Sequence, residues 1–145
     1  MKTKVDPLLK LLKFRQGEAG RALVLAQTQL STLEQERQGL EQHHEQAELA
    51  FEALQRTPSL PEDHALYRNF FIRLRTQIAG KDQEIEAQQQ VVEQCREALA
   101  EIHKELKTLE KYKENLIEHH KQEKKVLEAK ELDEIAGQNH RRQEA

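Results

Sequence analysis

One short segment interrupts an otherwise breaker-poor chain, Thr57-Pro58-Ser59-Leu60-Pro61, and no proline follows it. Each proline disfavours the helical conformation of the residue before it, so a long helix cannot run through this segment. Pro61 can itself open a second helix, because the amide hydrogen that it lacks is unused at that position. The sequence therefore predicts two long helices, over about residues 7–57 and 62–136, joined by a turn at 58–61.

The outer ends of the two helices carry weaker signals. Asp6-Pro7 is typical of a helix N-cap followed by proline at the first helical position. Gly137 is typical of a C-terminal stop, so a frayed tail is expected over residues 137–145. The chain is expected to form a single coiled-coil domain over residues 1–145.

Both predicted helices carry an apolar seam with heptad spacing. In alternating steps of three and four residues, eleven of fourteen positions from Leu9 to Leu54 and eleven of thirteen from Tyr67 to Leu109 are apolar. Beyond residue 110 the seam weakens abruptly. Abundant Ala, Leu, Glu, Gln, Lys and Arg also favour long helices. The predicted seam positions are Leu9, Leu12, Gln16, Ala19, Leu23, Ala26, Leu30, Leu33, Arg37, Leu40, His44, Ala47, Phe51, Leu54 and Tyr67, Phe71, Leu74, Ile78, Lys81, Ile85, Gln88, Val92, Cys95, Leu99, Ile102, Leu106, Leu109.

The weakening of the seam has a geometric explanation. A short turn makes the helices antiparallel, so residue i of the first lies near residue 121 − i of the second, within about one turn. The second helix then extends about 25 residues beyond the start of the first helix. The predicted fold class is all-α: two long helices forming an antiparallel coiled-coil hairpin, with helix 2 overhanging at its C-terminal end. The alternative is a parallel homodimer or trimer, in which Cys95 would face its own copy; in the hairpin we expect it to face Ala26.

The sequence argues against an enzyme, a metal site and a bound cofactor. It contains none of the phosphate-binding, nucleophile-elbow or zinc-protease motifs, and two packed helices cannot enclose a water-free pocket. The histidine pairs at 43–44 and 119–120 lie far apart in the hairpin, and adjacent helical residues diverge by about 100°. The single cysteine excludes an internal disulfide. No cofactor and no small-molecule ligand are expected.

Charge and hydropathy favour a cytoplasmic protein that binds other proteins. No apolar run approaches the length needed to cross a bilayer. The first 21 residues are basic and residues 34–62 are acidic, but the bases lack interleaved aromatic residues, so no nucleic-acid partner is expected.

Two sets of apolar residues exceed what a two-helix seam needs. Phe70 lies about 100° from the seam residue Phe71, so it either shields the tip of the hairpin or is exposed as an anchor for another protein. The overhang retains apolar residues among many Lys and Glu, which indicates that another protein covers it. The apolar residues of the overhang are Leu116, Ile117, Val126, Leu127, Leu132 and Ile135.

Three stretches of the sequence resemble the FliJ family of flagellar type III export proteins and the YscO-like proteins of virulence injectisomes. They are the opening Pro7-Leu8-Leu9-Lys10-Leu11-Leu12-Lys13-Phe14-Arg15, the central Tyr67-x-x-Phe70-x-x-x-Leu74-x-x-x-Ile78, and the terminal Glu131-Leu132-Asp133-Glu134-Ile135-Ala136. The resemblance covers nearly the whole chain, but only Arg141 and Arg142 follow as bases after Ala136. It leaves the flagellar and the virulence system equally open.

The resemblance implies a function without chemistry of its own. Members of this family look like the stalk of rotary ATPases, insert into the hexameric export ATPase, promote its assembly and activity, contact the linker of the export-gate membrane protein and bind export chaperones. By matching spacing, Phe70 and Leu74 would contact the gate. The implied location is the cytoplasm, peripherally associated with the inner-membrane export apparatus. The rivals are a self-assembling structural coiled coil and an escort that binds chaperones only. The residues implied to enter the ATPase ring are Leu8, Leu11, Arg15, Leu132, Asp133 and Ile135.

Overall fold

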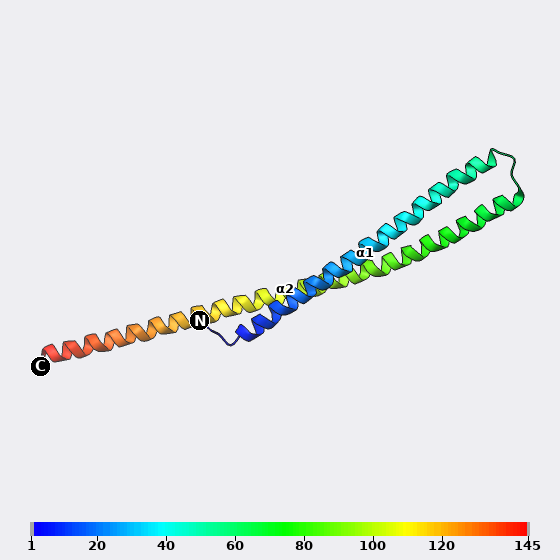
Figure 1. Ribbon diagram of the computed structural model, residues 1–145. Helices are drawn as coiled ribbons and strands as arrows, with labels where there is room; N and C mark the ends of the chain where they lie inside the picture. Colours follow the sequence, from blue (N-terminus) through cyan, green and yellow to red (C-terminus); the bar gives the residue numbers. More distant parts are fainter. Residues whose placement is uncertain (1, 145) are drawn as a thin grey trace. The chain divides into compact units, whose positions relative to one another are not determined.

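A computed structural model describes residues 2–144, and these residues are 94 % helical. Helix α1 spans Asp6–Gln55 and helix α2 spans Pro61–Glu144, and the two pack against each other with no strand in the described range. The chain reverses direction between the helices, so they are antiparallel (Figure 1). The predicted all-α helical hairpin is confirmed.

The chain divides into two compact units. Unit 1 comprises the residues up to Gly17 together with those from Ala100 onward, and unit 2 comprises Glu18–Leu99. Each unit therefore contains one segment of α1 and one segment of α2. The single domain predicted over residues 1–145 stays a prediction.

The predicted seam forms the core of each unit. Every seam residue predicted from Leu9 to Leu54 and from Tyr67 to Leu109 is buried or half-buried. In unit 1, Val5, Leu9, Leu12 and Leu106 form a cluster against which Ile102 and Leu109 pack. In unit 2, the buried residues Ala26, Ala47, Leu74 and Val92 lie on the same seam. Two helices provide only this narrow core, so most other side chains are exposed.

Pairs of facing residues define the register within each unit. In unit 1, Asp6 contacts Lys113 and Gln16 contacts His103; in unit 2, Arg37 contacts Asp82. Each α2 partner lies two positions before the one that the 121 − i relation gives, which is within the expected turn. The expected contact of Cys95 with Ala26 stays a prediction. The same shift places Val92 nearer Ala26 and Leu23 nearer Cys95, and Gln88 Nε2 donates a hydrogen bond to the Ala26 carbonyl oxygen at 3.0 Å.

The proline segment ends α1 and opens α2 as predicted, with a boundary shift of two residues in α1. The helix ends at Gln55, and the Thr57 amide and hydroxyl both donate to the Leu54 carbonyl oxygen, at 3.2 and 3.1 Å. These bonds satisfy a carbonyl group that the end of the helix leaves without a partner. The Ser59 hydroxyl lies 2.8 Å from His64 Nε2 and links the turn to the first turns of α2.

The start of α1 differs from the prediction that Asp6 is its N-cap. The Asp6 carboxylate reaches back to accept a hydrogen bond from the Thr3 amide at 2.8 Å, and the Thr3 hydroxyl also donates to it. In a capping box, the side chain three residues after the N-cap accepts a hydrogen bond from the N-cap amide. Asp6 makes this bond to the Thr3 amide, in the position more often held by Glu. Thr3 therefore takes the capping position.

The C-terminal end of α2 also differs from the prediction. The helix does not stop at Gly137 but continues through it to Glu144. A glycine stop needs the left-handed backbone conformation, and no described residue has a positive φ. Glycine inside a helix costs only about 1 kcal/mol relative to alanine, which one position does not turn into a helix end.

Candidate partner-binding surfaces

An open groove lies on unit 1 where the first turns of α1 meet α2. Its volume is about 510 Å³ and its lining is mostly apolar, with Leu12 and Leu109 at the seam and Leu8 and Tyr112 beside them. Leu8 is 48 % exposed and Tyr112 is 53 % exposed. The charged residues that line the groove are Arg15, Glu101, Lys104 and Glu105. The structure thus brings together two of the residues predicted to face the ATPase, Leu8 and Arg15.

Leu11, also predicted to face the ATPase, does not line this groove. It lies one turn after Leu8 on an adjoining face of α1, where Phe14 is also exposed. The basic opening of α1 therefore presents apolar side chains over a broader surface than the groove alone.

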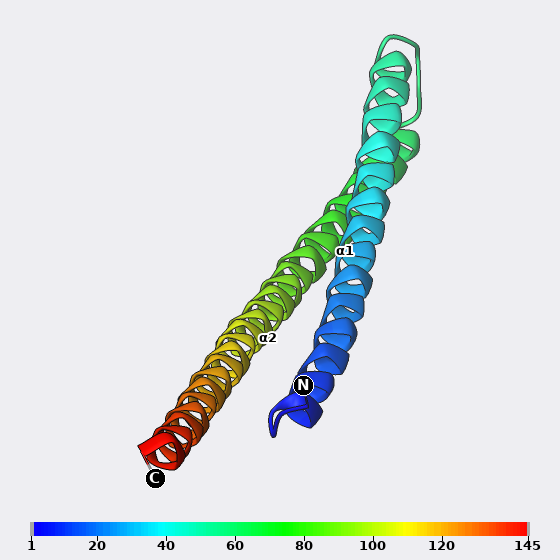
Figure 2. The same ribbon diagram turned by 90° about the vertical axis from the view of Figure 1, so that its left-hand side faces the viewer.

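Beyond the start of α1, helix α2 has no partner helix in unit 1 (Figure 1), and Figure 2 shows the molecule with this end of α2 toward the viewer. Every residue from 118 to 144 is exposed, which confirms the predicted overhang of helix 2. Leu132 is 67 % exposed and Ile135 is 54 % exposed, with Asp133 exposed between them. Val126 and Leu127 add to this apolar set one to two turns earlier.

The residues predicted to face the ATPase do not form one cluster. Leu132 lies 20 residues after Tyr112 on the same helix, which corresponds to about 30 Å at a rise of 1.5 Å per residue. Unit 1 therefore offers two surfaces: the groove around Leu8 and Tyr112, and the exposed end of α2.

The pair predicted to contact the gate divides between the surface and the core of unit 2. Phe70 is 39 % exposed and shares a shallow surface pocket with Leu66, Tyr67 and Arg73. Leu74 is only 4 % exposed and belongs to the seam. Phe70 is therefore the member of the pair that a partner can reach in this structure.

Aromatic side chains fill the seam behind Phe70. The ring of Phe51 lies 5.5 Å from that of Tyr67 and 5.8 Å from that of Phe71, measured between ring centroids. Phe71 also contacts His44, with centroids 5.2 Å apart. Such pairs add to the energy of burial and resist rearrangement, so Phe70 stands on a rigid support.

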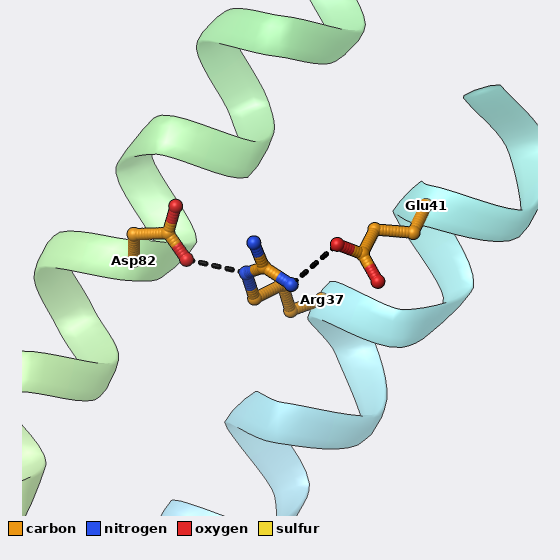
Figure 3. A network of polar contacts seen from close by, with 3 residues as sticks. All are labelled: Arg37, Glu41 and Asp82. Carbon is orange, nitrogen blue, oxygen red and sulfur yellow. Dashed lines mark hydrogen bonds and ion pairs between the residues drawn. The ribbon is translucent and has the colours of Figure 1, made fainter.

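A layer of ion pairs crosses the seam of unit 2. Arg37 donates to Asp82 of α2 and to Glu41 of its own helix (Figure 3), and Lys81 donates to Glu36 and Glu84. The Asp82 hydrogen bond, with a smaller effect from Glu41, raises the pKa of Arg37; the Glu36 hydrogen bond, then that of Glu84, raises the pKa of Lys81. Each cation thus has one carboxylate on the facing helix and one on its own helix.

Histidines in both units contact glutamates of their own helix. His44 Nδ1 lies 3.2 Å from Glu48, and His119 Nδ1 lies 3.4 Å from Glu123, each within one helix. Within residues 2–144, no three side chains of the metal-ligating types converge on a common point. Cys95 is half-buried in the seam. In the same residues, neither helix holds a stretch apolar enough to traverse a bilayer.

Sequence reasoning missed three exposed residues on these surfaces: Tyr112, Leu66 and Arg73. Tyr112 follows the seam residue Leu109 by one turn, and Leu66 precedes Phe70 by one turn. Tyr112 therefore shares a helix face with Leu109, and Leu66 shares one with Phe70. Arg73 carries a different signal, since it lies in a stretch of α2 without acidic residues.

The fold and these surfaces define a coiled-coil hairpin that exposes apolar residues in both of its units. The chain belongs to the FliJ family: the family model described as "Flagellar FliJ protein" matches residues 1–145, the whole chain. The protein is accordingly a component of flagellar type III export, in a family of accessory proteins not known as enzymes. Neither a curated protein nor a solved structure matches the chain.

Proposed function

We propose that this chain is a stalk-like accessory protein that binds the hexameric export ATPase, promotes its assembly and activity, and couples it to the export gate. The single observation that carries the proposal is the end of α2, where residues 118–144 are exposed throughout yet retain large apolar side chains. A single helix of this kind gains little stability by itself, so a partner that covers it explains why those side chains are there.

The ATPase contact divides between the two surfaces of unit 1. Leu132, Asp133 and Ile135 supply an apolar stripe with a negative charge, and Leu8, Leu11 and Arg15 supply the second surface beside Tyr112. A central position in a ring suits a narrow helix that exposes side chains on all sides, because several subunits can then contact it at once.

The gate contact is assigned to Phe70, with Leu74 as the buried residue that holds this part of α2 against α1. A partly exposed aromatic residue on a rigid support is typical of a binding hot spot. Binding of export chaperones belongs to the same proposal, as does a cytoplasmic location at the periphery of the inner-membrane export apparatus.

The test adds the purified chain to a purified flagellar export ATPase and measures ATP hydrolysis together with the oligomeric state of the ATPase. We expect faster hydrolysis and more hexamer. Leu132→Ala with Ile135→Ala removes apolar contacts and should lose most of this effect, whereas Glu128→Gln on the same exposed segment should retain it. Unchanged hydrolysis and oligomeric state with the native chain would rule out the ATPase contact.

A self-assembling structural coiled coil is the competing function, because the exposed apolar residues of α2 could also cover one another in a second copy. Light scattering decides between the two. A chain that is monomeric alone and forms a stable complex with the ATPase supports the proposal. A stable homodimer whose formation requires Leu132 and Ile135 contradicts it.

A further inference from the structure

We propose that the surface formed by Leu66, Phe70 and Arg73 docks an acidic, apolar segment of a protein partner, and that Arg73 selects the charge of that segment. This inference rests on the proposed gate contact at Phe70 and adds the chemistry of the partner. We call these three residues the Phe70 face.

The first observation is a charge pattern in α2. Between Asp63 and Asp82 the helix carries four basic residues and no acidic residue. The opposing segment of the chain, residues 34–62, is rich in glutamate. A basic stretch of this kind attracts acidic surfaces. Only the bases that are not already neutralised by acids of the hairpin can attract a partner. The four basic residues are Arg68, Arg73, Arg75 and Lys81.

The second observation is that these bases have different surroundings. Lys81 is paired with Glu36 and Glu84. Arg75 also makes no ion pair among the described residues, but it lines two surface pockets that contain four glutamates of α1. Arg73 makes no ion pair within residues 2–144, and the pocket that it shares with Phe70 contains no acidic residue. The glutamates in the Arg75 pockets are Glu41, Glu45, Glu48 and Glu52.

The Phe70 face therefore combines an uncompensated positive charge with apolar area. Leu66 is 68 % exposed and Phe70 is 39 % exposed. Leu66 lies four residues before Phe70 and Arg73 lies three residues after it, so all three share one side of α2. Arg73 is the only charged member of this pocket. A partner segment that places an apolar side chain on Phe70 thus brings its flanking charges close to one guanidinium group.

The chemistry of that contact favours a carboxylate. Arginine forms paired hydrogen bonds with a carboxylate and is weakly hydrated, so it suits an interface beside aromatic residues. A lysine or arginine in the same place on the partner would meet a like charge with no acid nearby to offset it. Apolar burial on Leu66 and Phe70 supplies affinity, and Arg73 supplies the preference for an acidic segment.

The experiment measures the binding of two labelled synthetic peptides to the full chain by fluorescence anisotropy. Both peptides form amphipathic helices with the same leucines, and one has glutamate where the other has lysine. We expect the acidic peptide to bind at least about threefold more tightly, a difference of the size that one exposed charge contact gives. The preference should shrink as salt is raised, because surface charges are screened.

Arg73→Gln and Arg75→Gln form a matched pair of variants, because the two arginines lie two residues apart in α2 and point to roughly opposite sides of it. Arg73→Gln should abolish the preference for the acidic peptide, and Arg75→Gln should keep it; circular dichroism verifies that both remain helical. Equal binding of the two peptides by the native chain, or an undiminished preference in Arg73→Gln, would overturn the inference. So would binding of phosphatidylserine vesicles through Arg73 in place of the acidic peptide.

A second arm separates this inference from the proposed gate contact. It measures binding of the purified cytoplasmic linker of the export gate to the same variants. Linker binding that is lost in Phe70→Ala but unaffected by Arg73→Gln would retain the gate contact and reject the role of Arg73. Selective binding of the acidic peptide with no binding of the linker would retain the role of Arg73 and reject the gate contact.

Discussion

The Asp6 carboxylate accepts a hydrogen bond from Lys113 Nζ at 2.7 Å, close to the point where α2 loses its partner helix. The same carboxylate holds the Thr3 amide at the start of α1. One side chain thus joins the capping of a helix to the packing of unit 1. The hydrogen bond from Lys113, followed by that from Thr3, lowers the pKa of Asp6 from its ordinary 3.8 to about 2.

This lowered pKa predicts that the start of α1 is sensitive to acid. The ionised carboxylate is favoured in the folded state, so its contribution to stability is complete above about pH 4 and is lost as the pH falls through about 2. Thermal unfolding followed by circular dichroism should show a smaller loss of stability between pH 5 and pH 2 for Asp6→Asn than for the native chain. Lys113→Gln should raise the pKa of Asp6, which nuclear magnetic resonance can measure. Equal acid sensitivity of Asp6→Asn and the native chain would contradict the assigned role.

The register predicts which engineered thiol can reach Cys95. Leu23→Cys should form a disulfide with Cys95 within one molecule under mild oxidation, because the register of the Arg37–Asp82 pair places position 23 opposite position 96, next to Cys95. Ala26→Cys should bridge more slowly, because it lies about one turn away. Non-reducing electrophoresis and mass spectrometry of dilute protein measure both rates. Faster bridging of Ala26→Cys, or bridges only between molecules, would refute this register.

The different exposure of Leu74 and Phe70 predicts different effects of their loss. Leu74→Ala should lower the free energy of unfolding by about 2–5 kcal/mol, the usual cost of removing a buried leucine side chain. Phe70→Ala should lower it by less than about 1 kcal/mol, since much of this ring already meets water. Urea unfolding followed by circular dichroism compares the two. A larger cost for Phe70→Ala would move this ring into the core and weaken its assignment as a docking residue.

The helical conformation of Gly137 predicts that alanine is favourable there. A Cβ atom at this position would meet nothing within 4 Å, and the backbone has no positive φ. Gly137→Ala should therefore stabilise the end of α2 by up to about 1 kcal/mol and slow amide exchange over residues 133–144. Faster exchange in the variant would indicate that Gly137 ends the helix in solution, as the sequence alone suggests.

The fold could be predicted from the sequence because its signals are repetitive. Two prolines located the turn, and every predicted seam position from Leu9 to Leu54 and from Tyr67 to Leu109 is buried or half-buried in the structure. The end of the seam near residue 110 also predicted the overhang. These features depend on periodicity over many residues, so single exceptions such as Gln16 or Arg37 did not obscure them.

The finer details depend on single side chains. The offset of two positions in the register lies within the turn that the spacing allowed, and contacts such as that of Arg37 with Asp82 define it. The capping role of Asp6 and the passage of α2 through Gly137 depend on local dihedral angles. For the surfaces, the sequence identified Phe70 and the end of α2, but it took the charge surroundings of Arg73 and Arg75 in the structure to distinguish one arginine from the other.

The ion-pair layer at Arg37 and Lys81 has a consequence for how the hairpin aligns itself during folding. Seams built from similar leucine layers can slide past each other by seven residues and still cover their apolar side chains. A slide of that size would remove Asp82 from Arg37 and Glu36 from Lys81. The replacements for Asp82 would be Arg75 or Gln89, and those for Glu36 would be Gln29 or His43.

None of these substitutes is an acid, so in a slipped hairpin each cation would lose its partner on the facing helix and keep only the carboxylate of its own helix, Glu41 for Arg37 and Glu84 for Lys81. The leucine layers can pack in several alignments of the two helices, whereas the ion pairs between the helices form in only one of them. Arg37 and Lys81, which interrupt the apolar seam, thus favour one alignment of the two helices over the others.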